Sequence, residues 1–252
     1  MEFQYRPIAQ KGDFWTFSVG MPDGTTSGYV KPGGKNVFIR RDLESDHSEG
    51  SAKFRQALVG TFGLAPWATL EGEKPKYFVT ARTDTVAENK MIADLWHRGQ
   101  HCIIPMHYFL RTRSGKLYPE RVAISSETNE PLGVAGLWSE WQHRNGHMAY
   151  SYVMLTTSGE QNSTMRWCRY QDYELRMPLI LSLDKQEKWL DVSPAKSLDF
   201  IEACPVVPLR THKPSEVPPI KQPGEVVRRR KKSTSAGGFS RVRPTGFLAA
   251  RD

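Results

Sequence analysis

Long uninterrupted apolar runs are absent from this sequence of 252 residues. No stretch approaches the roughly 20 consecutive apolar residues that a membrane-spanning helix needs. The first twenty residues also lack the basic, apolar and small-residue order of a secretory signal peptide. The sequence therefore predicts a cytoplasmic protein that has no membrane partner.

Cysteine is scarce, with residues only at positions 102, 168 and 204. Their number and wide spacing exclude a disulfide framework, and no pair has the Cys-x-x-Cys spacing of a ribbon-type zinc site. One short segment has several side chains that could bind a metal through nitrogen or sulfur. Neighbouring residues of a strand point to opposite faces, so these side chains should not all meet at one metal ion. We therefore expect neither a metal site nor a cofactor. The ligands of that segment are His97, His101, Cys102 and His107.

Several sequence motifs of enzymes and nucleotide-binding proteins are missing as well. There is no P-loop, no GxGxxG following a strand, no HExxH and no GxSxG. These absences exclude the commonest nucleotide-binding, metalloprotease and serine-hydrolase sites. Any function must rest on a less general set of residues.

Positive charge is concentrated in one part of the chain. The whole sequence carries a net charge of +8, and residues 213–252 account for +7 of it. This segment contains the basic run Arg228–Lys232, is rich in Pro, Gly and Ser, and has little apolar surface to bury. We predict one domain over residues 1–212 followed by a basic disordered tail over residues 213–252. Such a tail either contacts nucleic acid or keeps the protein soluble.

The rest of the sequence favours strands over helices. Runs rich in β-branched and aromatic residues recur between turn residues, whereas helical periodicity is rarer. Because the strands do not alternate with helices, we predict an α+β fold: a single domain with a curved, mostly antiparallel, barrel-like sheet and a few short helices. The predicted strands are Asn36–Arg40, Lys76–Arg82, His101–Thr112, Arg121–Ser126, Leu132–Trp141, Met148–Thr157 and Leu175–Ser182.

Three segments have helical patterns. Ala87–Arg98 has apolar residues at helical spacing and ends before a glycine. Asp184 can cap a short helix that holds Trp189 and Leu190. Ser193, followed by a proline, predicts the start of a last helix.

Six short segments stand out in order along the chain and together span about 200 residues. They are Tyr5–Pro7, Phe62–Trp67, Thr80–Thr85, His101–Pro105, Ala135–Trp138 and Arg176–Pro178. In the same order, they resemble motifs of the SOS-response-associated peptidase (SRAP) family, the abasic-site-shielding proteins. The similar family motifs include WGLIPxW, NARAET, RCLIP, AGLWE and RMP.

The resemblance implies a chemistry that this sequence does not support. Active family members use the α-amine and thiol of a cysteine at the second position to close a thiazolidine ring on an abasic site. Here the second position is Glu2, Thr80 replaces an orienting asparagine, and Arg111 falls on or near the acid/base glutamate. Arg169 or Glu174 takes the place of the active-site histidine. The resemblance therefore implies that the covalent link is lost.

The residues that would hold DNA remain. Arg82 and Arg176 match family arginines, the first of which contacts phosphate, and Trp67 matches an aromatic residue beside the unpaired nucleotide. We therefore expect a monomer that binds single-stranded, abasic or otherwise damaged DNA without reacting with it. The alternative interpretation makes Trp67 a core residue and places the two arginines in structural ion pairs. Three other tryptophans are interpreted as core residues, namely Trp138, Trp141 and Trp167.

Two further functional hypotheses stay open. In the first, the protein remains an abasic-site enzyme, with lyase or peptidase activity, and recruits Asp84, Glu174 or Cys168 for the chemistry. In the second, it is a protein-interaction module whose former groove accepts a peptide. Covalent trapping of abasic DNA separates the first hypothesis from simple binding, and salt-dependent retention on DNA separates the second.

Overall fold

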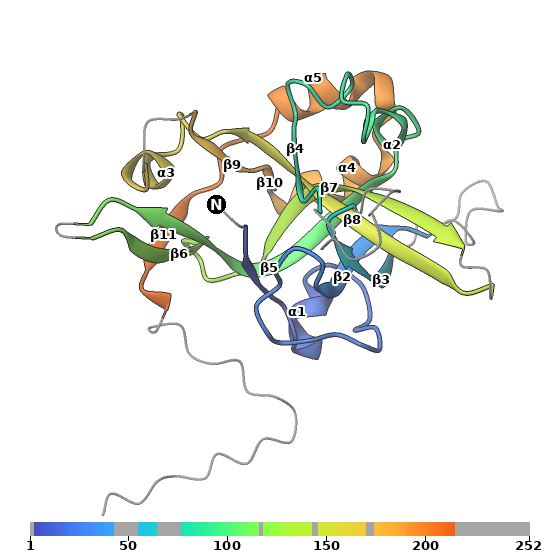
Figure 1. Ribbon diagram of the computed structural model, residues 1–252, viewed down its shortest axis with the longest axis horizontal. Helices are drawn as coiled ribbons and strands as arrows, with labels where there is room; N and C mark the ends of the chain where they lie inside the picture. The colour runs from blue at the N-terminus through green and yellow to red at the C-terminus, as the bar shows by residue number, and fades with distance from the viewer. Residues whose placement is uncertain are drawn as a thin grey trace, which may run out of the picture.

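The computed structural model describes residues 3–42, 55–64, 77–115, 118–142, 146–169 and 174–214 (Figure 1). Glu2 and Trp67 lie outside the described residues. So does the predicted tail, except for its first two residues. Within these ranges, no helix is both long enough and apolar enough to cross a membrane.

Five strands pair in a closed ring and form a barrel. They are β2 (Lys35–Arg41), β3 (Arg55–Phe62), β8 (Met148–Ser158), β7 (Leu132–Gln142) and β5 (His101–Arg113). β7 pairs with both β5 and β8, and β2 returns to β5, which closes the ring. Because β3 and β8 are parallel while the other neighbours in the ring are antiparallel, the sheet is mostly antiparallel.

The long strand β5 extends the sheet beyond the barrel. β1 (Tyr5–Pro7) pairs with it on one side and β6 (Glu120–Ser126) on the other. β11 (Leu209–His212) then pairs with β6. The beginning and the end of the described chain are therefore strands of the same sheet.

The end of β8 is flanked by short strands on both sides. β4 (Thr80–Arg82) runs parallel to one edge of β8, and β9 (Arg176–Pro178) runs antiparallel along the other. β10 (Ile180–Leu181) continues from β9 onto β7. This arrangement brings two segments that are about ninety residues apart in the sequence to the same part of β8.

Short helices complete the domain. In Figure 1, α2, α4 and α5 lie together on one side of the sheet, whereas α3 lies apart from them beside β6 and β11. The helices are α1 (Lys11–Trp15), α2 (Ala93–His97), α3 (Ser163–Trp167), α4 (Leu183–Asp191), the 3-10 helix η1 (Pro194–Lys196) and α5 (Ser197–Glu202).

Successive side chains of the barrel strands point to opposite faces of the sheet and pack into two hydrophobic cores. On β2, Phe38 packs into the core inside the barrel with Trp138 and Tyr152. Its neighbour Ile39 faces the other way, into the core between the sheet and the helices, where it joins residues such as Trp189. The β-branched and aromatic composition of these strands is therefore explained by burial on both faces.

The predicted α+β fold with a curved, mostly antiparallel sheet is confirmed. Three details of the prediction are wrong. The helix expected over Ala87–Arg98 forms only over 93–97, after a series of turns. The helix expected to be capped by Asp184 begins at Leu183 with Ser182 as its N-cap residue. The single strand expected over Leu175–Ser182 is split into β9 and β10 because it leaves β8 to pair with β7.

Candidate functional site

Arg82 and Arg176 come together at the end of β8. Arg82 ends β4 and is the cross-strand partner of Thr156, and Arg176 begins β9 opposite Ser158. The carbonyl oxygen of Thr156 accepts hydrogen bonds from the backbone N–H of Thr83 (3.0 Å) and from Nη2 of Arg176 (2.6 Å). The pairing of both short strands with β8 therefore fixes the positions of the two arginines.

Two carboxylates bridge these arginines into a four-charge cluster made of Arg82, Asp84, Glu174 and Arg176. Arg82 lies 2.6 Å from Asp84 Oδ2 through Nη2 and 2.6 Å from Glu174 Oε2 through Nη1. Arg176 lies 3.2 Å from Asp84 Oδ1 and 3.0 Å from Glu174 Oε1. Each acid thus contacts both arginines, and the formal charge of the cluster is zero.

The cluster is open to solvent on one side. Arg82, Asp84 and Glu174 each have 47% of the side chain exposed, whereas Arg176 has 18% exposed. The hydrogen bond from Arg82 is the main cause that lowers the pKa of Asp84 to about 2. The same contact raises the pKa of Arg82. The exposed face of Arg82 is accessible to solvent.

The structure distinguishes the two residues considered for the position of the family histidine. Glu174 lies in the four-charge cluster. Arg169 instead forms an ion pair with Glu160. Glu174 is therefore the residue that the fold places next to Arg82 and Arg176.

Thr80 and Arg111, which the resemblance assigns to the asparagine and glutamate positions, lie elsewhere on the same sheet. Thr80 is half-buried in β4, two residues before Arg82, with Met154 as its cross-strand partner. Arg111 lies in β5, next to Leu110, whose backbone N–H donates a hydrogen bond to the carbonyl oxygen of Gln4 at 2.9 Å.

Arg111 is partly buried. Burial is the main cause that lowers its pKa, and its Nε has no hydrogen-bond partner among the residues that the structure describes. Cys168 lies close to both Arg111 and Arg113, and burial raises the pKa of its thiol to about 11. This thiol stays protonated at neutral pH and is a poor nucleophile.

Trp167 shows that one sequence interpretation is wrong. The sequence predicts it in the core, but 53% of it is exposed. Trp138 is buried inside the barrel as expected, and Trp141 is only partly buried. Helix α3 gave no sequence signal because it is a single short turn, so the exposed face that carries Trp167 was not predictable.

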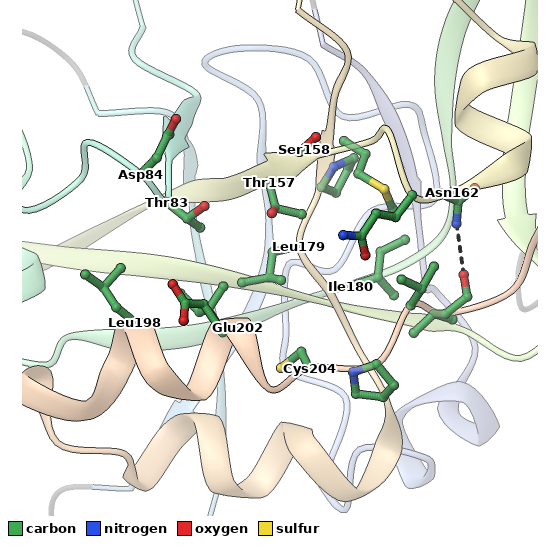
Figure 2. Close-up of a pocket in the computed structure, with 17 residues that line it drawn as sticks. Thr83, Asp84, Thr157, Ser158, Asn162, Leu179, Ile180, Leu198, Glu202 and Cys204 are labelled. Atoms are coloured by element: carbon green, nitrogen blue, oxygen red, sulfur yellow. Dashed lines mark hydrogen bonds between the residues drawn. The ribbon is translucent and has the colours of Figure 1, made fainter.

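A pocket of about 400 Å³ adjoins the four-charge cluster through Asp84 (Figure 2). In the figure, β8 runs along one side with Thr157 and Ser158, and α5 runs along the other with Leu198 and Glu202. Among the described residues, no lysine, arginine or histidine lines the pocket. A phosphate group would therefore find no positively charged side chain among the residues that line this pocket.

The possible metal ligands of the His97–His107 segment do not converge. His101 stacks on Trp189 in the outer core, while Cys102 is buried inside the barrel. His107 Nε2 lies 3.1 Å from Asp13 Oδ2, away from the other three residues. In the described part of the chain, no three side chains of the metal-ligating types lie together.

Comparison with protein families gives one match over most of the chain. The family model described as SOS response associated peptidase (SRAP) matches residues 21–216. Abasic site processing protein YoaM of Bacillus subtilis (strain 168) is 30% identical over 164 residues, which cover 62% of this chain and 65% of that protein. Abasic site processing protein YoqW of the same bacterium is 26% identical, with coverage of 62% and 66%. The chain therefore matches just under two thirds of the length of these relatives.

Solved structures with the same fold come from other bacteria. A protein from Bordetella bronchiseptica has a TM-score of 0.69 and 24% identity, and the match covers 82% of this chain and 97% of that protein. A protein from Bacteroides thetaiotaomicron has a TM-score of 0.56 and 18% identity, with coverage of 78% and 85%. At these identities the similarity establishes the fold alone.

Proposed function

This chain belongs to the SOS response associated peptidase (SRAP) family, and on that premise we propose that it binds single-stranded or abasic DNA without forming a covalent link. The observation that carries the proposal is the meeting of Arg82 and Arg176 at one exposed position. Two arginines that present several N–H groups in one place suit a phosphate, which accepts hydrogen bonds in the same way as the carboxylates now between them. The relatives YoaM and YoqW are named as abasic site processing proteins, which supports DNA as the ligand.

Binding requires an exchange of anions at the cluster. A DNA phosphate that approaches Arg82 replaces part of its contact with Asp84 or Glu174, and the displaced carboxylate returns to solvent. Because the acids are nearly half exposed, this exchange costs little desolvation. The hydrogen bond from Arg176 to the carbonyl oxygen of Thr156 keeps that arginine in position during the exchange.

The proposal of non-covalent binding rests on the residues at the substituted positions. By the family resemblance, Thr80 and Arg111 stand where an orienting asparagine and a proton-transferring glutamate are expected. A threonine hydroxyl and an arginine guanidinium cannot accept a proton near neutral pH. Two of the three groups that an enzyme could recruit are poorly suited, since Asp84 is held ionised between two arginines and the thiol of Cys168 is buried and protonated. Glu174, the third group, is left to the test below.

The direct test combines two measurements on the same sample. The protein is incubated with fluorescent single-stranded DNA that carries an abasic site, and binding is followed by fluorescence anisotropy. The sample is then heated in detergent and separated on a denaturing gel. We expect saturable binding and no heat-stable band at the mass of protein plus DNA. A heat-stable band contradicts non-covalent binding, and no anisotropy change contradicts DNA binding altogether.

A further inference from the structure

Trp167 is exposed at the end of a short helix that is otherwise anchored in the core. It is the last residue of α3 and is 53% exposed, next to the exposed Arg166, whereas Met165 and Cys168 are fully buried. The exposed part of this large apolar ring is available to a partner.

A cation–π contact with Arg113 holds the ring of Trp167 in place. The guanidinium of Arg113 lies over the ring at 3.9 Å from its centroid, so one face is already covered by a stacked cation. Arg113 is in turn held by Glu120, its cross-strand partner in β6, at 2.6 Å. Arg113 of β5 and Glu120 of β6 thus support one face of the ring, and the rest of the ring stays exposed.

Helix α3 is itself anchored to the sheet. The side chain of Asn162 accepts a hydrogen bond from Met165 N at 3.1 Å and donates one to the carbonyl oxygen of Val207 at 3.1 Å. Thr164 donates to the carbonyl oxygen of Leu209 in β11 at 2.6 Å. These contacts fix the backbone that carries Trp167, so little side-chain and loop entropy remains to be lost when a ligand binds.

Arginines outnumber glutamates among the described residues around the ring, unlike in the neutral four-charge cluster. The charged side chains on α3, on the described residues that flank it and on the ends of β5 and β6 include four arginines and two glutamates. In Figure 1, α3 faces the β5–β6 hairpin on the same side of the molecule as β9, which carries Arg176. The charged residues are Arg111, Arg113, Arg166, Arg169, Glu120 and Glu160.

We propose that Trp167 and Arg113 form a platform on which one unpaired base of single-stranded DNA stacks. A flat aromatic ring with one face on a guanidinium and with basic neighbours suits a nucleobase attached to a phosphate backbone, because stacking and counterion release act together there. The platform rests on the proposed function and extends it, since it adds a subsite on α3 to the arginines at the end of β8. No sequence motif pointed to this site.

The test compares two probes that differ only in their bases. One is a fluorescent oligo-dT, and the other is an oligomer of equal length made of tetrahydrofuran phosphodiester units, which has the backbone without bases. Trp167→Ala is expected to weaken oligo-dT binding by about 5- to 150-fold, the effect of losing one base–aromatic stack. It should leave the salt dependence of that binding and the affinity for the base-free oligomer unchanged, because no phosphate contact is removed.

Three further variants isolate the aromatic ring. Trp167→Phe keeps a stacking surface and should retain most of the affinity for oligo-dT, whereas Trp167→Leu keeps an apolar side chain without a ring and should behave like the alanine variant. Trp15→Ala is the matched control, because Trp15 is 76% exposed but lies in α1. It should bind both probes like the parent. The parent protein itself must prefer oligo-dT to the base-free oligomer, and equal affinities overturn the platform without any variant.

The outcomes separate the platform from the function on which it rests. If the parent binds oligo-dT and the folded Trp167 variants keep its affinity, the platform is wrong while DNA binding stands. If the parent binds neither probe, both proposals are wrong. If the ring variants lose affinity and Arg82→Ala and Arg176→Ala do not, the platform is supported and the arginine site is the part to abandon.

Discussion

Arg82 and Arg176 reach the same two carboxylates from opposite edges of β8, one from β4 and the other from β9. The four-charge cluster is therefore assembled by strand pairing, and the arginines are in place before any DNA arrives. Such preorganisation lowers the entropic cost of binding. Under the proposed function, the acids would compete with phosphate for the same N–H groups.

That competition predicts a gain of affinity when one acid is neutralised. Glu174→Gln removes the negative charge that contacts both arginines and keeps the size of the side chain. Single-stranded DNA should therefore bind up to about five-fold more tightly, a magnitude in line with the weak energies of exposed ion pairs. Fluorescence anisotropy at low salt measures the change. Glu187→Gln is the control, since Glu187 is an exposed acid that pairs with Arg55 at 3.6 Å outside the cluster. Weaker DNA binding by the Glu174 variant would mean that the carboxylate orients the arginines rather than competing with phosphate.

A second prediction concerns stability against pH and the buried His101. Burial is the main cause that lowers its pKa from 6.5 to about 4, although its hydrogen bond to the carbonyl oxygen of Trp189 opposes this. Between these two pH values the unfolded chain binds a proton that the folded chain does not. The free energy of unfolding should therefore fall as the pH drops from about 6.5 to about 4, by on the order of 3 kcal/mol from this residue.

Urea unfolding of the parent and of His101→Gln at pH 7.5 and at pH 4.5 measures this contribution. The variant is expected to lose stability at both pH values, because the contacts with Trp189 and Ser197 are lost, but to lose less than the parent between them. The pKa of His107 is also lowered by burial, so part of the pH dependence stays in both proteins. An unchanged pH dependence in the variant means that His101 is not the responsible group.

A third prediction concerns Gly136, which lies in β7 at the closure of the barrel. A Cβ at this position would lie 2.7 Å from the carbonyl oxygen of Val153 and 3.0 Å from Sγ of Cys102. Gly136→Ala should therefore destabilise the fold by about 1–3 kcal/mol, the usual cost of overpacking a core. Gly12→Ala is the control, because a Cβ added there, in helix α1, would meet no neighbouring side chain or strand within 4 Å. Thermal unfolding that ranks the two variants the other way would contradict the close packing at β7.

Much of the fold was predictable because burial on both faces leaves a clear mark on the sequence. The runs that became β2, β5, β6, β7 and β8 are rich in β-branched and aromatic residues, and their bounds agree with the structure within a few residues. β3 was missed, and although a barrel-like sheet was predicted, the strand pairs that close it were not. Closure depends on β7 pairing with two partners at once and on the parallel pairing of β3 with β8, and neither pairing is encoded by local periodicity.

The candidate site was predictable only in part, and for a similar reason. The motifs identified Arg82 and Arg176, and the structure places both in ion pairs with Asp84 and Glu174, as the alternative interpretation predicted. Their contact with DNA stays a prediction. Asp84 and Glu174 each contact both arginines because β4 and β9 lie on either side of β8. This arrangement is a property of the sheet and not of the motifs. The exposed position of Trp167 depends in the same way on tertiary contacts.

The salt dependence of DNA binding tests the central claim most directly. Affinity for oligo-dT is measured by anisotropy over a series of KCl concentrations for the parent, Arg82→Ala and Arg176→Ala. Arg98→Ala serves as the control, since Arg98 is an exposed arginine paired with Asp94 at 2.8 Å outside the cluster. If each cluster arginine contacts one phosphate, each substitution should weaken binding and reduce the slope of log affinity against log salt by about 0.7, the value per contact for single strands. Folded Arg82 and Arg176 variants that retain the affinity and the slope of the parent would contradict the claim that these two residues hold DNA.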